Sequence, residues 1–120
     1  MTVYDIEARM PCALLIHDLD QGKDVWLDGE HFELTMDQAR EMAYAVESAG
    51  GFASFGPDRH GVTITAFRTL SEVWVGFDRI GQGDYGASLS LDSCAKLIEA
   101  LREDPAPAPK LYYAEVKGGE

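Results

Sequence analysis

The sequence predicts an α+β domain in which a mostly antiparallel sheet carries two amphipathic helices on one face. Two observations lead to this fold class. A strand pattern runs directly into a capped helical pattern twice along the chain, and hairpin-turn signals separate several short apolar runs. Because the chain has 120 residues, we expect a single domain that spans residues 1–120.

The two halves of the chain resemble each other in the order of their motifs. The segment Asp24–Leu27 returns as Glu72–Val75 at an offset of 48 (73 − 25), and Leu34–Ala39 returns as Leu89–Cys94 at an offset of 55 (89 − 34). A longer hairpin loop at Gly81–Gly86 would absorb the difference. We therefore expect a duplicated β-β-β-α unit at approximately 12–50 and 62–104. The alternative is that a common strand-into-helix pattern occurs twice by chance.

Both helical segments have the same apolar spacing, i, i+3, i+6, i+7 and i+10, which forms one inward stripe. Thr35 and Ser90 are N-cap residue types, and Gln38 completes a capping box with Thr35. We expect the first helix to end at Gly50-Gly51 and the second to end before Pro105. The stripes consist of Met36, Ala39, Met42, Ala43 and Val46 in the first helix, and of Leu91, Cys94, Leu97, Ile98 and Leu101 in the second.

Three short strands are expected before each helix. In the first copy they are Cys12–Leu19, Asp24–Asp28 and His31–Leu34, and in the second they are Val62–Arg68, Val73–Arg79 and Tyr85–Leu89. Asp28-Gly29 is a hairpin-turn dipeptide. Two further strands are expected at Thr2–Ala8 and at residues 111–116. The last of these contains Tyr112-Tyr113, and an exposed edge there would allow a homodimer by strand pairing.

Acidic side chains dominate the composition, with 21 acidic against 10 basic residues and a formal charge of −11. This balance argues against direct binding of a nucleic-acid backbone. The excess is greatest in the first half, which holds 12 acidic and 4 basic residues. We expect a surface that binds a protein partner with a basic face, the alternative being a solvated face that only keeps the protein soluble. The residues expected in this surface are Asp18, Asp20, Asp24, Trp26, Asp28, Glu30 and Glu33.

No residue pattern indicates catalysis or a cofactor. The alternate carboxylates Asp18, Asp20 and Asp24 resemble the start of a calcium loop, but Gly22 stands where a further oxygen ligand is needed. A solvated hairpin turn is therefore favoured, with a calcium or small-ligand module as the alternative function. The three histidines share no ligand spacing, and no nucleophile–base pair emerges, so we expect a protein that is not an enzyme.

The two cysteines, Cys12 and Cys94, lie in apolar surroundings and are expected to be buried, reduced thiols. Neither a signal-peptide pattern nor an apolar run of membrane-spanning length is present, so the expected location is the cytoplasm.

The segment Phe32–Ala43, a strand that runs into Leu34-Thr35-Met36-Asp37-Gln38-Ala39 and then a helix, resembles small uncharacterised actinobacterial and actinobacteriophage proteins. With both copies counted, the similarity covers about a third of the chain. The resemblance assigns no activity and no functional residue. It implies a phage or mobile-element accessory protein, for which inhibitory binding to a host protein is a common role.

Overall fold

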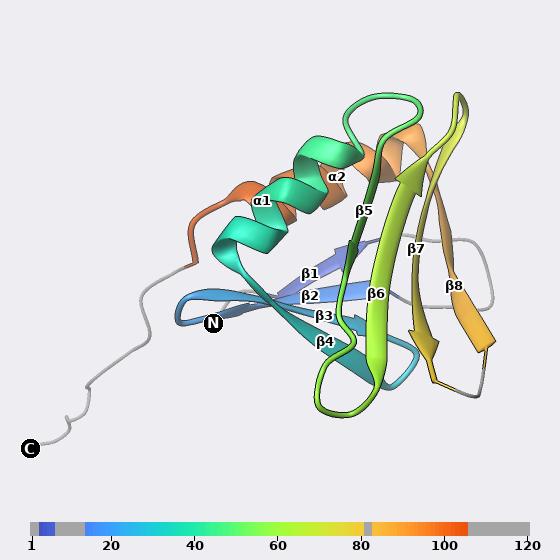
Figure 1. Ribbon diagram of the computed structural model, residues 1–120. Coiled ribbons are helices and arrows are strands. Elements are labelled where there is room, and N and C mark those ends of the chain that lie inside the picture. Colours follow the sequence, from blue (N-terminus) through green and yellow to red (C-terminus); the bar gives the residue numbers. More distant parts are fainter. Residues whose placement is uncertain (1–2, 7–13, 81–82, 106–120) are drawn as a thin grey trace, which may run out of the picture.

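The computed structural model describes residues 3–6, 14–80 and 83–105, except the side chain of Asp5, and confirms the α+β class. The strands form two antiparallel four-stranded sheets, each followed by a helix (Figure 1). The elements are β1 Val3–Ile6, β2 Leu14–Leu19, β3 Gly22–Leu27, β4 Glu30–Thr35, α1 Met36–Ala45, β5 Phe52–Phe55, β6 Val62–Arg68, β7 Glu72–Arg79, β8 Gly83–Ser90 and α2 Leu91–Arg102.

Each sheet is a simple meander in which consecutive strands pair. The first sheet has the order β1-β2-β3-β4, and the second has the order β5-β6-β7-β8. The expected turn at Asp28-Gly29 joins β3 to β4, and both residues have a positive φ, 51° and 90°. This conformation suits a two-residue hairpin because its twist matches that of the flanking strands. It pairs Leu27 with Glu30 and fixes the register of the whole hairpin.

Each sheet has four strands, one more than the three of the expected β-β-β-α unit. The predicted strand at residues 2–8 is β1, which pairs with β2. The corresponding strand of the second half, β5, was not predicted. It is four residues long and pairs with β6, with Phe52 opposite Phe67.

The helix starts agree with the sequence prediction, and α2 ends before Pro105 as expected, but α1 ends at Ala45 and not at Gly50-Gly51. The Thr35 hydroxyl accepts a hydrogen bond from the Gln38 amide, and the Gln38 side chain accepts one from the Thr35 amide, so the capping box is present. Ser90 caps α2 in the same way, through the amide of Ser93. Most residues of the predicted stripes face the core, whereas Met36 is only half-buried and Leu91 is 40% exposed, each at the first turn of its helix.

Strand pairing places the two halves in a slightly different alignment from the one that sequence identity suggested. Thr35, the residue before α1, pairs with Gly22, and Ser90, the residue before α2, pairs with Glu72. Strand β7 therefore follows β3 at an offset of 50 (72 − 22), and not 48. Trp26 and Trp74 each lie on the outer face of their sheet. At an offset of 50, however, Trp74 lies two residues before the position that corresponds to Trp26, so the two tryptophans are not equivalent.

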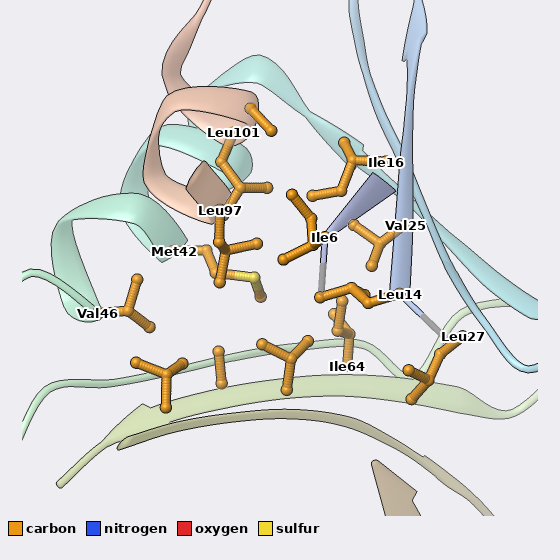
Figure 2. Close-up of a cluster of buried hydrophobic side chains, with 14 of the residues drawn as sticks. Ile6, Leu14, Ile16, Val25, Leu27, Met42, Val46, Ile64, Leu97 and Leu101 are labelled. Carbon is orange, nitrogen blue, oxygen red and sulfur yellow. The ribbon is translucent and has the colours of Figure 1, made fainter. Parts of the chain in front are cut away.

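One apolar core joins both sheets and both helices. Figure 2 shows side chains from β1, β2, β3, β6 and both helices converging between the layers. Cys94 belongs to this core, as expected, and its thiol lies 3.4 Å from the carbonyl oxygen of Val46. Burial raises the pKa of this thiol, and the charge of Arg68 opposes the shift only in part.

Several expectations fall on residues outside the described ranges. These are the start of the predicted strand at residues 12–19, the whole strand at 111–116 with its tyrosines, and Cys12. Neither helix in the part of the chain that the structure describes has the length and apolar character needed to cross a lipid bilayer.

Candidate functional site

The acidic residues expected to form one surface lie on different sides of the first sheet. Strand alternation places Asp18 on the inner face with Leu14 and Ile16, whereas Asp24 and Trp26 lie on the outer face of β3. Asp20 lies in the turn before β3 and Asp28 in the turn after it, at opposite ends of that strand. The residues therefore form a smaller outward group and a separate inward one.

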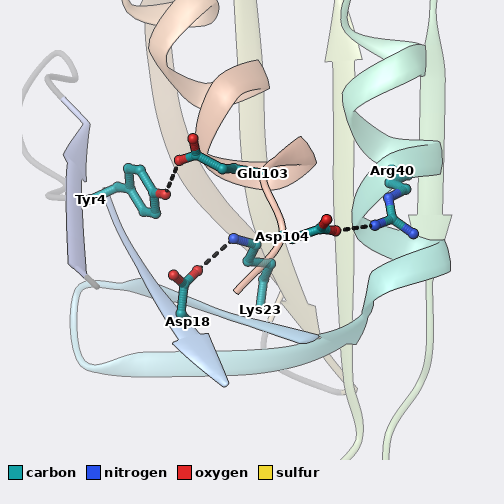
Figure 3. A network of polar contacts seen from close by, with 6 residues as sticks. All are labelled: Tyr4, Asp18, Lys23, Arg40, Glu103 and Asp104. Carbon is teal, nitrogen blue, oxygen red and sulfur yellow. Dashed lines mark hydrogen bonds and ion pairs between the residues drawn. The ribbon is translucent and has the colours of Figure 1, made fainter. Parts of the chain in front are cut away.

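Asp18 is the inward residue, and it is paired with the only basic residue near it in the sequence. Lys23 lies opposite Asp18 across the β2–β3 hairpin, and its ammonium is 2.5 Å from the Asp18 carboxylate. The two side chains are 0% and 3% exposed. Figure 3 shows this pair beneath the ring of Tyr4, whose centroid lies 5.4 Å from the Lys23 nitrogen. Asp18 therefore balances the charge of Lys23 inside the fold and is not part of an outward surface.

The same network closes the end of the core nearest to the end of α2. The Tyr4 hydroxyl donates a hydrogen bond of 2.6 Å to Glu103, and Arg40 of α1 pairs with Asp104 (Figure 3). The hydrogen bond to Glu103, together with burial and nearby carboxylates, raises the pKa of the Tyr4 hydroxyl. These contacts fasten the last helix to both β1 and α1.

The outward group is built around Trp26 on β3. Its indole stacks on His31 of β4, with ring centroids 4.5 Å apart, and on His17 of β2 at 5.6 Å. Asp24 fixes this arrangement, because one of its oxygens accepts the indole N–H at 2.9 Å and the other lies 2.8 Å from Nδ1 of His31. Asp24 is only 7% exposed, whereas Trp26 is half-buried and Glu33, directly across from Asp24, is exposed.

Glu30 has a structural partner in the second sheet. Nη2 of Arg79, at the end of β7, lies 2.5 and 2.6 Å from the two carboxylate oxygens of Glu30. This ion pair connects the start of β4 to the second sheet and neutralises the charge of Glu30. Three of the seven residues expected in the surface carry an outward charge that forms no ion pair with another described residue. They are Asp20, Asp28 and Glu33.

A cavity of about 370 Å³ borders this group and is lined by His31, Glu33, Asp58, Arg59 and His60. Its far wall is the loop between β5 and β6. There Asp58 accepts hydrogen bonds from the backbone amides of His60 and Val62, at 2.8 and 3.0 Å. Burial alone would raise the pKa of Asp58, but these two hydrogen bonds outweigh it and the pKa lies below its ordinary value. Asp58 is thus an ionised loop anchor.

The metal alternatives have little support in this geometry. Because Asp18 and Asp24 lie on opposite faces of the sheet, the calcium-like motif does not converge on one ion. Asp24, His31 and Glu33 do offer ligand atoms within 4.8 Å of one another. However, both oxygens of Asp24 are already engaged by Trp26 and His31, so a metal ion would have to compete with these two contacts.

Sequence reasoning missed the role of the two histidines beside Trp26. The signal was the Asp28-Gly29 turn, because a two-residue hairpin turn places Trp26 opposite His31 and Asp24 opposite Glu33. It also missed the proximity of Asp58 and His60 to this face. No local signal marks that proximity, since it depends on how the two sheets pack.

No protein-family model, curated protein or solved structure matches this chain.

Proposed function

We propose that this protein is a non-catalytic binding module that uses the outer face of the first sheet to dock onto a basic region of another protein. Trp26 is the apolar anchor of this face, and Glu33, Asp28 and Asp20 are its outward charges. Asp24 holds Trp26 and His31 in place and is a positioning residue.

The observation that supports this proposal most strongly is the half-buried Trp26 on a sheet face that lies opposite both helices (Figure 1). An indole fixed by a hydrogen bond and two stacked rings loses little conformational freedom when it is covered. Tryptophan is also enriched among the residues that carry most of the energy of protein interfaces. The face is therefore suited to contact another macromolecule.

The electrostatics of the described residues favour a basic partner. Internal ion pairs engage four of the basic side chains, namely Lys23, Arg40, Arg79 and Arg102. The remaining carboxylates therefore give the surface a net negative field, in agreement with the formal charge of −11. Such a field accelerates association with a positive surface and weakens as salt is added.

A partner surface that normally receives a phosphate backbone would fit this module, because both ligands present negative charge. Binding of this protein would then exclude the nucleic acid from that surface. This mode of action agrees with an accessory protein that inhibits a host protein.

We expect the charge of the outer face to determine what the protein captures. The double variant Asp28→Asn/Glu33→Gln removes two charges from the face, and asparagine tolerates the positive φ at residue 28. Immobilised wild type, this variant and a matched control would be incubated with cell lysate at about 50 and about 300 mM salt. The control, Glu41→Gln/Glu99→Gln, removes two exposed charges from the helices.

The expected result is a basic protein that wild type and control retain at low salt, and that the face variant loses. High salt should release it from wild type and from the control. If the two double variants captured the same proteins in equal amounts, binding would depend on net charge alone and the proposed face would be wrong.

A further inference from the structure

A second uncovered face lies on the outer side of the second sheet, and it does not belong to the site described above. A groove of about 300 Å³ runs over this face. Its lining includes Phe52 of β5, Phe67 of β6 and Trp74 of β7, with Asp78 and Asp84 toward one end. We propose that this groove docks an arginine side chain of a partner protein.

The groove has a continuous aromatic wall. Phe52 pairs with Phe67, and Phe67 pairs with Trp74, so the three side chains form one row across neighbouring strands. The rings of Phe67 and Trp74 are stacked, with centroids 5.4 Å apart and planes at 25°. Phe52 is 64% exposed and Phe67 is 37% exposed. Exposed aromatic rows of this kind mark interaction sites more often than single apolar residues do.

Two glycines leave room for the indole of Trp74 against the sheet. Gly76 and Gly86 pair across β7 and β8, and a Cβ atom on either would lie within 2.3–2.6 Å of the Trp74 ring. The indole therefore lies over bare backbone, against the sheet. Any larger residue at these positions would displace it from the groove.

The end of the groove carries an uncompensated negative charge. Asp78 and Asp84 are directly opposite each other on β7 and β8, and both are exposed. Two like charges at a directly paired position destabilise a sheet. Neither carboxylate forms an ion pair or hydrogen bond with any residue of the described ranges. A cation from outside would relieve this repulsion.

An arginine side chain matches both parts of the groove. Its guanidinium stacks on aromatic faces and also forms paired hydrogen bonds with carboxylates. The negative field of the chain attracts a basic segment and opposes occupation by a second copy of the same protein, whose formal charge is also −11. Because the groove lies on the face of a sheet, it suits a side chain projecting from a protein segment.

The test uses a short peptide of alternating arginine and glycine, and a matched peptide with neutral citrulline in place of arginine. The protein carries Trp26→Phe, so that Trp74 is the only tryptophan and reports on the groove by fluorescence. We expect the arginine peptide to bind and to change this fluorescence, and the citrulline peptide to bind about tenfold more weakly or not at all.

Variants then locate the binding. Asp78→Asn/Asp84→Asn should weaken binding of the arginine peptide about tenfold, whereas the helix variant Glu41→Gln/Glu99→Gln, of equal charge, should change it less than about twofold. Circular dichroism would verify that both variants are folded. Glu33→Gln should leave the peptide affinity unchanged, which separates this groove from the function proposed above.

Three results would overturn the proposal. Equal weakening by both double variants would indicate attraction by net charge alone. Equal affinity for the citrulline peptide would indicate a site for apolar ligands. A concentration-dependent dimer in sedimentation experiments that Trp74→Ala abolishes would assign the face to self-association.

Discussion

At the scale of single residues, the environment of a carboxylate decides its role more than its place in the sequence does. Asp18 and Asp24 both belong to the acidic segment, but one is enclosed in the core with Lys23 and the other orients Trp26 and His31. The alternation of Leu14, Ile16 and Asp18 along one strand face already indicates that Asp18 points inward. The partner could also be predicted, because Lys23 is the single cation of the segment.

The buried pair leads to a prediction about stability. Lys23→Met removes the ammonium and leaves the Asp18 carboxylate enclosed without a counter-charge, so we expect the free energy of unfolding to fall by about 3–5 kcal/mol. Urea denaturation followed by circular dichroism measures this loss. Lys96→Met, at an exposed position of α2, is the matched control and should have little effect.

A second variant separates burial of a lone charge from loss of packing. The double variant Asp18→Leu/Lys23→Met replaces both charges by apolar groups, and it should recover most of the stability. If the double variant were as unstable as Lys23→Met alone, the shape of the lysine side chain, and not its charge, would be the important property.

At the scale of elements, periodicity predicted most of the fold. The capped helices and the hairpins depend on local chemistry, so Thr35, Ser90 and Asp28-Gly29 marked them correctly. Strand β5 was missed because its large residue Phe52 points outward, which inverts the usual pattern of apolar residues inside. The offset between the halves was wrong by two residues because identical tryptophans were aligned, whereas pairing partners define structural equivalence.

Asp78 of β7 and Asp84 of β8, which lie directly opposite each other, lead to a prediction about thermal stability. Asp84→Asn removes one charge of the repelling pair, and we expect Tm to rise by a few degrees at most. Asp92→Asn removes a charge of the same sign from the first turn of α2, where it interacts favourably with the helix dipole, so Tm should fall. Thermal unfolding followed by circular dichroism compares the two. A rise in both variants would mean that relief of net charge outweighs these local effects.

At the scale of the whole molecule, the helices join two halves that share one element order, a four-stranded sheet followed by a helix. Helix α1 packs on β3 and β4 of the first sheet and on β5 and β6 of the second, and α2 packs on β1 as well as on β7 and β8. The Glu30–Arg79 pair adds a direct link between the sheets. This arrangement of two sheets at an angle, and the cavity at their border, follow from long-range packing, for which no short motif provides a signal.

The shared core predicts that neither half unfolds alone. Trp26 and Trp74 are the two tryptophans of the chain and lie in different sheets, so Trp74→Phe leaves a reporter of the first sheet and Trp26→Phe leaves a reporter of the second. In each variant we expect fluorescence and circular dichroism to give the same urea midpoint, because each helix contributes to both sheets. Comparison within one variant cancels any loss of stability that the substitution itself causes. A fluorescence transition that precedes the circular dichroism transition in either variant would show that the repeated units are separate cooperative units, in conflict with a core that both sheets and both helices share.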